Sequence, residues 1–93
     1  MTTTRRFDIA EHLETDDDIR AFLLESANTD EPSDFIHALA IAARAKGMSE
    51  VAKQAGVTRA SLYKSLADDG NPRFDTVAKV CAALGVRLHA SAA

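Results

Sequence analysis

The chain has 93 residues, of which 46% are hydrophobic and 27% are charged. This balance excludes a disordered chain, and the length accommodates a single hydrophobic core. The lone Cys81 excludes an internal disulfide, and the sequence has neither a long apolar run nor a basic, apolar leader. We therefore expect a cytoplasmic protein that does not enter the membrane.

The formal net charge of −3 is unevenly distributed along the chain. Residues 1–46 carry five basic and ten acidic side chains, a net −5, whereas residues 47–93 carry six basic and four acidic ones, a net +2. A negative total argues against nucleic-acid binding, which depends on neutralising phosphates, but the distribution matters more than the total. The division predicts two surfaces with different partners.

The first 34 residues predict an arm followed by an acidic helix. Phe7, Ile9 and Leu13 are apolar at spacings that suit neither a long helix nor a strand, so we interpret residues 1–14 as an arm that packs on the domain. Thr15 then precedes three aspartates, which is typical of a helix start because the hydroxyl caps free amides and carboxylates face the positive helix end. The apolar stripe of this helix comprises Ile19, Phe22, Leu23 and Ala27.

Three further helices are predicted up to about Leu66. Pro32 suits the first turn of a helix that Gly47 ends, and its apolar stripe is wide enough to be buried on more than one side. A short helix then begins at Ser49 and is closed by Gly56. The last of the three begins at Thr58.

Residues 67–73 have turn chemistry throughout, and a fifth helix follows from about Phe74 to Leu84. The tail over residues 86–90 alternates apolar and polar side chains, which predicts either a short edge strand or a frayed end. We therefore expect an all-α, five-helix protein with a possible short C-terminal strand. It divides into an N-terminal arm and acidic helix (1–34), a central domain (35–86) and a tail (87–93).

The stretch from Met48 to Leu66 is the most informative part of the sequence. Two short helices that cross steeply come very close at their turn, which requires a small residue in the first helix and a glycine where the backbone reverses. Ala52 and Gly56 meet these requirements. Val51, Val57 and Leu62 are placed to lock the two helices together, and Thr58 to cap the second. The pattern predicts a helix-turn-helix.

These residues, followed by Gly70-Asn71-Pro72-Arg73-Phe74 and the apolar spacing from Val77 to Val86, resemble the phage-repressor (Cro/C1-type) helix-turn-helix over residues 35–86. Over the whole chain, Phe7-Asp8-X-Ala10-Glu11 and Ser61-Leu62-Tyr63-Lys64 are similar to the HigA-like addiction module antidote proteins. This resemblance implies an antitoxin of a type II toxin-antitoxin system, which neutralises a RelE/HigB-like toxin and represses its own operon.

The repressor resemblance implies that the helix beginning at Thr58 enters the major groove of double-stranded operator DNA by its N-terminal end. Arg59 is the best candidate for reading a base, since its planar fork can bond a guanine edge twice, whereas Lys64 is placed to meet phosphate. Ser61 can serve either role, and Ala60 can only press on a thymine methyl. The candidate DNA contacts on this helix are Thr58, Arg59, Ala60, Ser61, Tyr63 and Lys64.

Ser49 and Arg73 are candidate anchors for the flanking DNA backbone. Met48 departs from the repressor pattern, because many such domains carry a phosphate-contacting Gln there. Since one small, weakly basic module should hold DNA poorly, we expect a homodimer on a palindromic operator.

Other interpretations remain open for several of these residues. Arg59 and Lys64 can be ordinary solvated charges, and Tyr63 can pack at the domain edge instead of touching DNA. The aspartates at 16–18 are explained as a helix start, so the broader acidic front is the better candidate for covering a basic, RNA-directed toxin. The alternative functions are a stand-alone phage-type regulator and a protein-only adaptor.

Catalysis has little support in the sequence. The three histidines, His12, His37 and His89, lack metal-ligand spacing, and Cys81 lies on an apolar helix face where it is most simply a core residue. No nucleophile has a base at recognisable spacing, and no phosphate loop is present. We expect no catalytic residue, no metal and no cofactor.

Overall fold

Five α-helices follow a short 3-10 helix along residues 8–92, the part of the chain that the computed structural model describes. No strand occurs within this range, which confirms the all-α prediction. Phe7 and the rest of residues 1–7 lie outside it, as does residue 93. The elements are η1 (Ile9–His12), α1 (Asp16–Ser26), α2 (Pro32–Lys46), α3 (Met48–Ala55), α4 (Arg59–Ser65) and α5 (Phe74–Ala83).

The ends of α1 and α2 follow the predicted chemistry. The Thr15 hydroxyl accepts a hydrogen bond from the Asp18 amide at 3.0 Å, and the Asp18 carboxylate accepts one from the Thr15 amide at 3.2 Å. This reciprocal capping box satisfies backbone donors that the helix itself leaves free. Pro32 is the first residue of α2, and Gly47 ends it with a φ of 116°. Local sequence therefore fixes where both helices begin.

One hydrophobic core joins all five α-helices. Leu39 and Ala42 of α2 are completely buried at its centre, where α1, α3 and α5 also contribute side chains. The cluster includes Ile19 and Leu23 of the acidic helix, so α1 packs on the rest instead of standing apart. The η1 segment lies on α2, and Leu13 packs against the core. The division at residue 34 stays a prediction.

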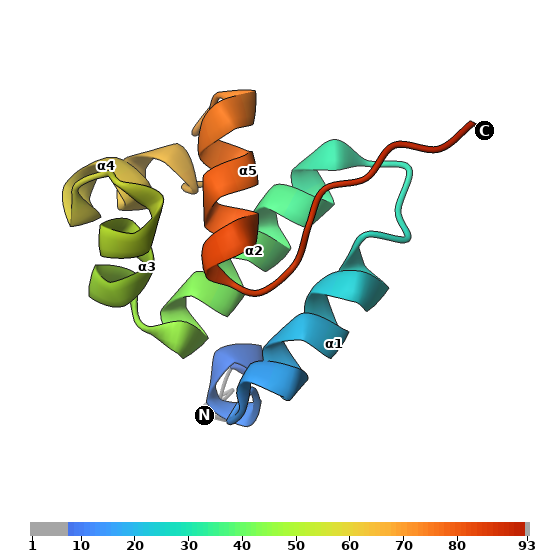
Figure 1. Ribbon diagram of the computed structural model, residues 1–93, viewed down its shortest axis with the longest axis horizontal. Coiled ribbons are helices and arrows are strands. Elements are labelled where there is room, and N and C mark those ends of the chain that lie inside the picture. Colours follow the sequence, from blue (N-terminus) through green and yellow to red (C-terminus); the bar gives the residue numbers. More distant parts are fainter. Residues whose placement is uncertain (1–7, 93) are drawn as a thin grey trace, which may run out of the picture.

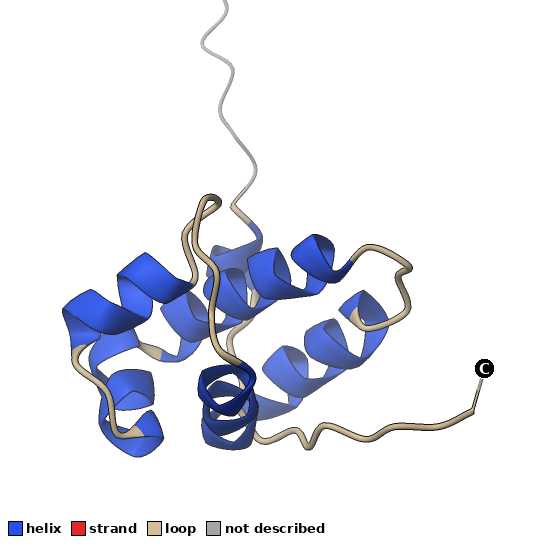
Figure 2. Cartoon of the chain, turned by 90° about the horizontal axis from the view of Figure 1, so that it is seen from above, coloured by secondary structure: helices blue, strands red, loops and turns tan. Residues whose placement is uncertain are grey.

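Figure 1 shows α3 and α4 on one side of α5 and α1 on the other, with α2 passing behind. In Figure 2, α5 is seen end-on at one edge of the molecule, and the C-terminal tail runs away from it. The arrangement leaves one side of α4 and one side of α5 facing outward.

Two sequence predictions need correction. The possible strand in the tail is absent over residues 86–92, which have no regular structure, because no other strand is available there to pair with it. The third helix begins at Met48, one residue before the predicted Ser49, and no side chain caps it. Met48 itself is only 7% exposed, since it fills part of the core.

Candidate nucleic-acid interface

The two short helices α3 and α4 are joined by a tight turn at Gly56. Gly56 has a φ of 73°, in the left-handed region that favours glycine, and the Val57 amide donates back to the Ala52 carbonyl at 3.0 Å. This hydrogen bond closes the end of α3, so that the chain reverses within three residues. The predicted role of Gly56 is confirmed.

The inner sides of α3 and α4 are anchored in the core. Val51 and Leu62 are completely buried, Ala52 is 3% exposed, and Val57 packs against the cluster from its edge. Because Leu62 is the one buried residue in α4, this helix is held along a single side. The predicted contact residues on this helix, Arg59, Ala60, Ser61, Tyr63 and Lys64, are all exposed.

The start of α4 is fixed by Thr58 and Ser61. The Thr58 hydroxyl accepts a hydrogen bond from the Ser61 amide at 3.0 Å and donates one to the Ser61 hydroxyl at 2.9 Å. Thr58 is therefore the helix cap, as predicted. The hydroxyl proton of Ser61 stays available to a ligand, while that of Thr58 is engaged within the chain.

Arg59 and Tyr63 lie one turn apart and form a pair on the exposed side of α4. The guanidinium carbon is 5.4 Å from the centre of the tyrosine ring, within cation–π range, and an arginine nitrogen lies 3.4 Å from the tyrosine hydroxyl. Tyr63 is 45% exposed. The ring thus restricts the positions that the guanidinium takes, a relation that the sequence analysis did not foresee although the spacing of four residues permits it.

Ala60 and Lys64 complete this surface, and both are exposed. Lys64 forms no ion pair with any residue in 8–92, so its charge is open to a partner. The helix contains no aspartate or glutamate, in a chain that carries more acidic than basic residues. The exposed side of α4 therefore carries positive charge and no negative charge.

The loop after α4 is packed tightly against the end of that helix. A Cβ built on Gly70 would lie 2.5 Å from the Ser65 carbonyl oxygen and 2.6 Å from that of Lys64. Only glycine permits this approach, which brings the loop leading to Arg73 beside α4. The sequence marks Gly70 as a turn residue, but its contact with α4 is a tertiary feature that the sequence analysis missed.

The two predicted anchors lie outside α4. Arg73 precedes α5 with its side chain 84% exposed, and its Nε is 3.3 Å from the Asp75 carboxylate, a neighbour that the sequence analysis missed. Ser49 is exposed on the first turn of α3. Met48, where the repressor resemblance implies a phosphate-contacting Gln, is buried in the core.

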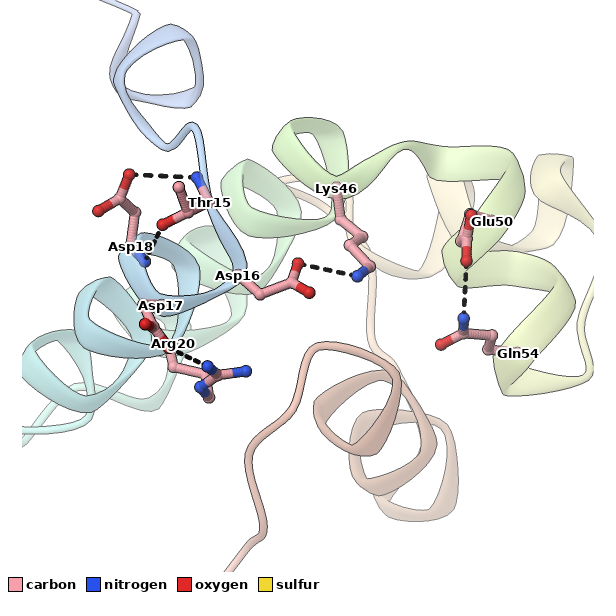
Figure 3. Close-up of polar contacts among 8 residues, drawn as sticks. All are labelled: Thr15, Asp16, Asp17, Asp18, Arg20, Lys46, Glu50 and Gln54. Atoms are coloured by element: carbon pink, nitrogen blue, oxygen red, sulfur yellow. Dashed lines mark hydrogen bonds and ion pairs between the residues drawn. The ribbon is translucent and has the colours of Figure 1, made fainter.

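The three aspartates at the start of α1 form contacts within the protein (Figure 3). Asp16 accepts a hydrogen bond from Lys46 at 2.9 Å, which links the beginning of α1 to the end of α2, and Asp17 pairs with Arg20. Asp18 forms the capping box described above. The bond and charge of Lys46 hold the pKa of Asp16 below its ordinary value. These contacts agree with the interpretation of residues 16–18 as a helix start.

Cys81 is completely buried, and burial raises the pKa of its thiol to about 11. It is a core residue, as predicted.

Within the described range, no group of three His, Cys, Asp or Glu side chains is arranged to hold a metal ion. None of the helices in residues 8–92 is long and apolar enough to cross a bilayer.

Comparison with known proteins adds the family to this geometry. Residues 3–92 match the family described as "Probable addiction module antidote protein". The chain belongs to this antidote family. A relative from Haemophilus influenzae, described as an uncharacterized protein, is 43% identical over 83 residues, which cover 89% of this chain and 86% of the relative. No solved structure matches the chain.

Membership confirms the predicted resemblance to addiction module antidotes. An antidote family implies a non-enzymatic regulatory protein and a toxin of some kind as its partner.

Proposed function

We propose that this antidote is a HigA-like antitoxin of a type II system, which binds double-stranded operator DNA through a Cro/C1-type helix-turn-helix formed by α3 and α4. The observation that carries the proposal is the exposed side of α4, where Arg59 and Lys64 stand without any acidic neighbour on the same helix. Because nucleic-acid binding depends on neutralised phosphates, this is the part of an acidic chain best suited to DNA. Two copies on a palindromic operator would repress the antidote's own operon.

The roles of the α4 side chains follow from their chemistry. Arg59 reads a guanine edge through its two parallel N–H groups, with Tyr63 limiting the positions of the guanidinium. Lys64, one and a half turns further along, meets phosphate. The Ser61 hydroxyl, whose proton is free, donates a hydrogen bond to a base or to a phosphate. Thr58 contributes mainly by fixing the start of the helix.

The flanking residues would hold the DNA backbone. Arg73 reaches it from the loop that Gly70 packs against α4, and Ser49 from the first turn of α3. Asp75 lies against Arg73 and competes with phosphate for its charge, so Arg73 should contribute less than Lys64.

The toxin partner is proposed to be RelE/HigB-like and basic, because a protein that acts on RNA needs a positive surface. The acidic front half of the chain would cover it by charge complementarity. Since Asp16, Asp17 and Asp18 have partners of their own and Asp8 pairs with Arg44, the better candidates for this contact are the exposed Glu11, Glu14 and Glu25.

Binding to the DNA upstream of the gene tests the proposal. Arg59→Ala should weaken binding by about 1–3 kcal/mol and relax the sequence preference, whereas Lys64→Ala should weaken binding to all sequences alike and reduce the salt dependence. Arg20→Ala, which removes an arginine from α1, is the matched control and should bind as the wild type does. If Arg59→Ala and Lys64→Ala also bind normally, α4 does not contact DNA.

The genetic neighbourhood separates the antitoxin from a stand-alone phage-type regulator. A small basic reading frame beside the gene, whose toxicity co-expression of this chain abolishes, supports the antitoxin. A neighbour that has no toxicity supports the free regulator. A protein-only adaptor would leave the upstream DNA unshifted in a gel.

A further inference from the structure

The outer side of α5 carries an apolar surface that the rest of residues 8–92 leaves exposed. Phe74, the first residue of α5, is 75% exposed, the highest value among the large hydrophobic side chains that lie exposed in residues 8–92. Beside it lies a hollow of about 580 Å³ lined by Phe74, Ala78, Ala82, Val86 and Leu88, with Arg87 among its walls. An aromatic ring next to an apolar hollow is costly to leave in water.

This row of side chains can pair with the same row of a second copy. Phe74, Ala78 and Ala82 are spaced four residues apart and so form one row along the helix. If two α5 helices pack antiparallel and cross at Ala78, the Phe74 ring of one copy lies level with Ala82 of the other. Each ring then enters the partner's hollow, and both copies bury the same patch, as a two-fold interface requires.

The charges beside this row fit the same arrangement. Asp75 and Lys79 are exposed on the adjoining row of α5. In the antiparallel pair, Lys79 of one copy lies about 3 Å along the axis from Asp75 of the other, at a rise of about 1.5 Å per residue. The two-fold axis generates this pair twice along the same side of the apolar contact, so opposite charges face each other at both places.

We propose that the face formed by Phe74, Ala78, Ala82 and Leu88 is the interface through which two copies of this chain form a dimer. The inference deepens the proposed function, since it names the surface that joins the two copies on an operator. The interface begins at the residue after Arg73, so it lies next to the loop proposed to anchor DNA.

Sedimentation of the full chain tests the proposal. The wild type should sediment at twice the 10.0 kDa mass of one chain, and Phe74→Glu at the single-chain mass. Because Phe74 is so exposed, the variant should keep the helical circular dichroism of the wild type. A wild type that is monomeric throughout, or a Phe74→Glu variant that stays dimeric, overturns the inference.

A mixing experiment separates contacts between copies from contacts within one helix. Asp75→Lys and Lys79→Asp should each be monomeric, because like charges then face each other across the interface. An equal mixture should form heterodimers, since the two lysines of the first variant then meet the two aspartates of the second. A mixture that stays monomeric contradicts the antiparallel pairing.

The same proteins distinguish this inference from the proposed function. A dimer that Phe74→Glu disrupts, but that never binds the upstream DNA, supports the interface and refutes the DNA-binding proposal. If the wild type binds the operator and the Phe74→Glu variant is still a dimer, the DNA-binding proposal is supported and the interface is refuted.

Discussion

Replacing Gly70 by Ala should destabilise the protein through the contact between the loop and the end of α4. The added Cβ would lie 2.5 Å and 2.6 Å from two backbone carbonyl oxygens, those of Ser65 and Lys64. Ordinary contact begins near 3.4 Å, so the backbone must separate by nearly an ångström at both atoms. Because neither atom belongs to a flexible side chain, the cost should reach the range of about 1–3 kcal/mol seen for overpacked cores.

One effect opposes this cost. Alanine restricts the unfolded chain and so stabilises the folded state by roughly 0.4–1 kcal/mol where its backbone conformation suits it, and Gly70 lacks a positive φ. The overpacking term is the larger, so the net change is a loss. In a domain of this size, each 1 kcal/mol lowers the Tm by roughly 4–8 °C.

Thermal and denaturant unfolding of Gly70→Ala measure this loss directly. The matched control is Gly56→Ala, where a Cβ meets nothing within 4 Å but the φ of 73° is unfavourable, at a cost of about 1–2 kcal/mol. Only Gly70→Ala should also weaken any contact that Arg73 makes, because it shifts the loop before that residue. A Gly70→Ala variant as stable as the wild type would refute the close packing of the loop on α4.

Three further predictions follow from the core and from the titrating groups. Leu62→Ala should cost about 2–5 kcal/mol in denaturant unfolding, whereas Leu24→Ala, at 65% exposure, should change stability by less than about 0.5 kcal/mol; equal losses would contradict the burial of Leu62. The thiol of Cys81 should resist Ellman's reagent until the chain unfolds. Since its pKa is raised to about 11, stability present below pH 9.0 should fall as the pH rises from 9.0 toward 11, and an unchanged slope in Cys81→Ala would contradict this. The lowered pKa of Asp16 gives stability that is present above pH 3.8 and is lost as the pH falls below it. In Lys46→Met, the pKa of Asp16 followed by NMR should return to near 3.8. A pKa that stays as in the wild type would show that Lys46 is not the cause.

Local sequence was sufficient to predict most of the fold. The cap at Thr15, Pro32 at the first turn of α2 and the glycines at 47 and 56 fixed helix ends that the structure confirms, because caps and turns depend on a few adjacent residues. The start of α3 was misjudged by one residue, since the core takes in Met48, and burial of a side chain depends on the whole fold.

The candidate site was only partly predictable. The outward direction of the α4 side chains follows from the helical period once Leu62 is placed in the core. The contact of Arg59 with Tyr63 and the packing of Gly70 on α4 depend on side-chain rotamers and on a loop path that periodicity does not encode. The exposed face of α5 was missed for a different reason, because a row of Phe and Ala suits a buried core equally well.

The central claim is that α4 is the surface that meets operator DNA, and NMR of the labelled chain titrated with the upstream DNA tests it most directly. The account predicts that the largest amide shifts fall on residues 58–64, with smaller ones around Arg73 and Ser49. Shifts that concentrate on α1, or a spectrum that the DNA leaves unchanged, would contradict it.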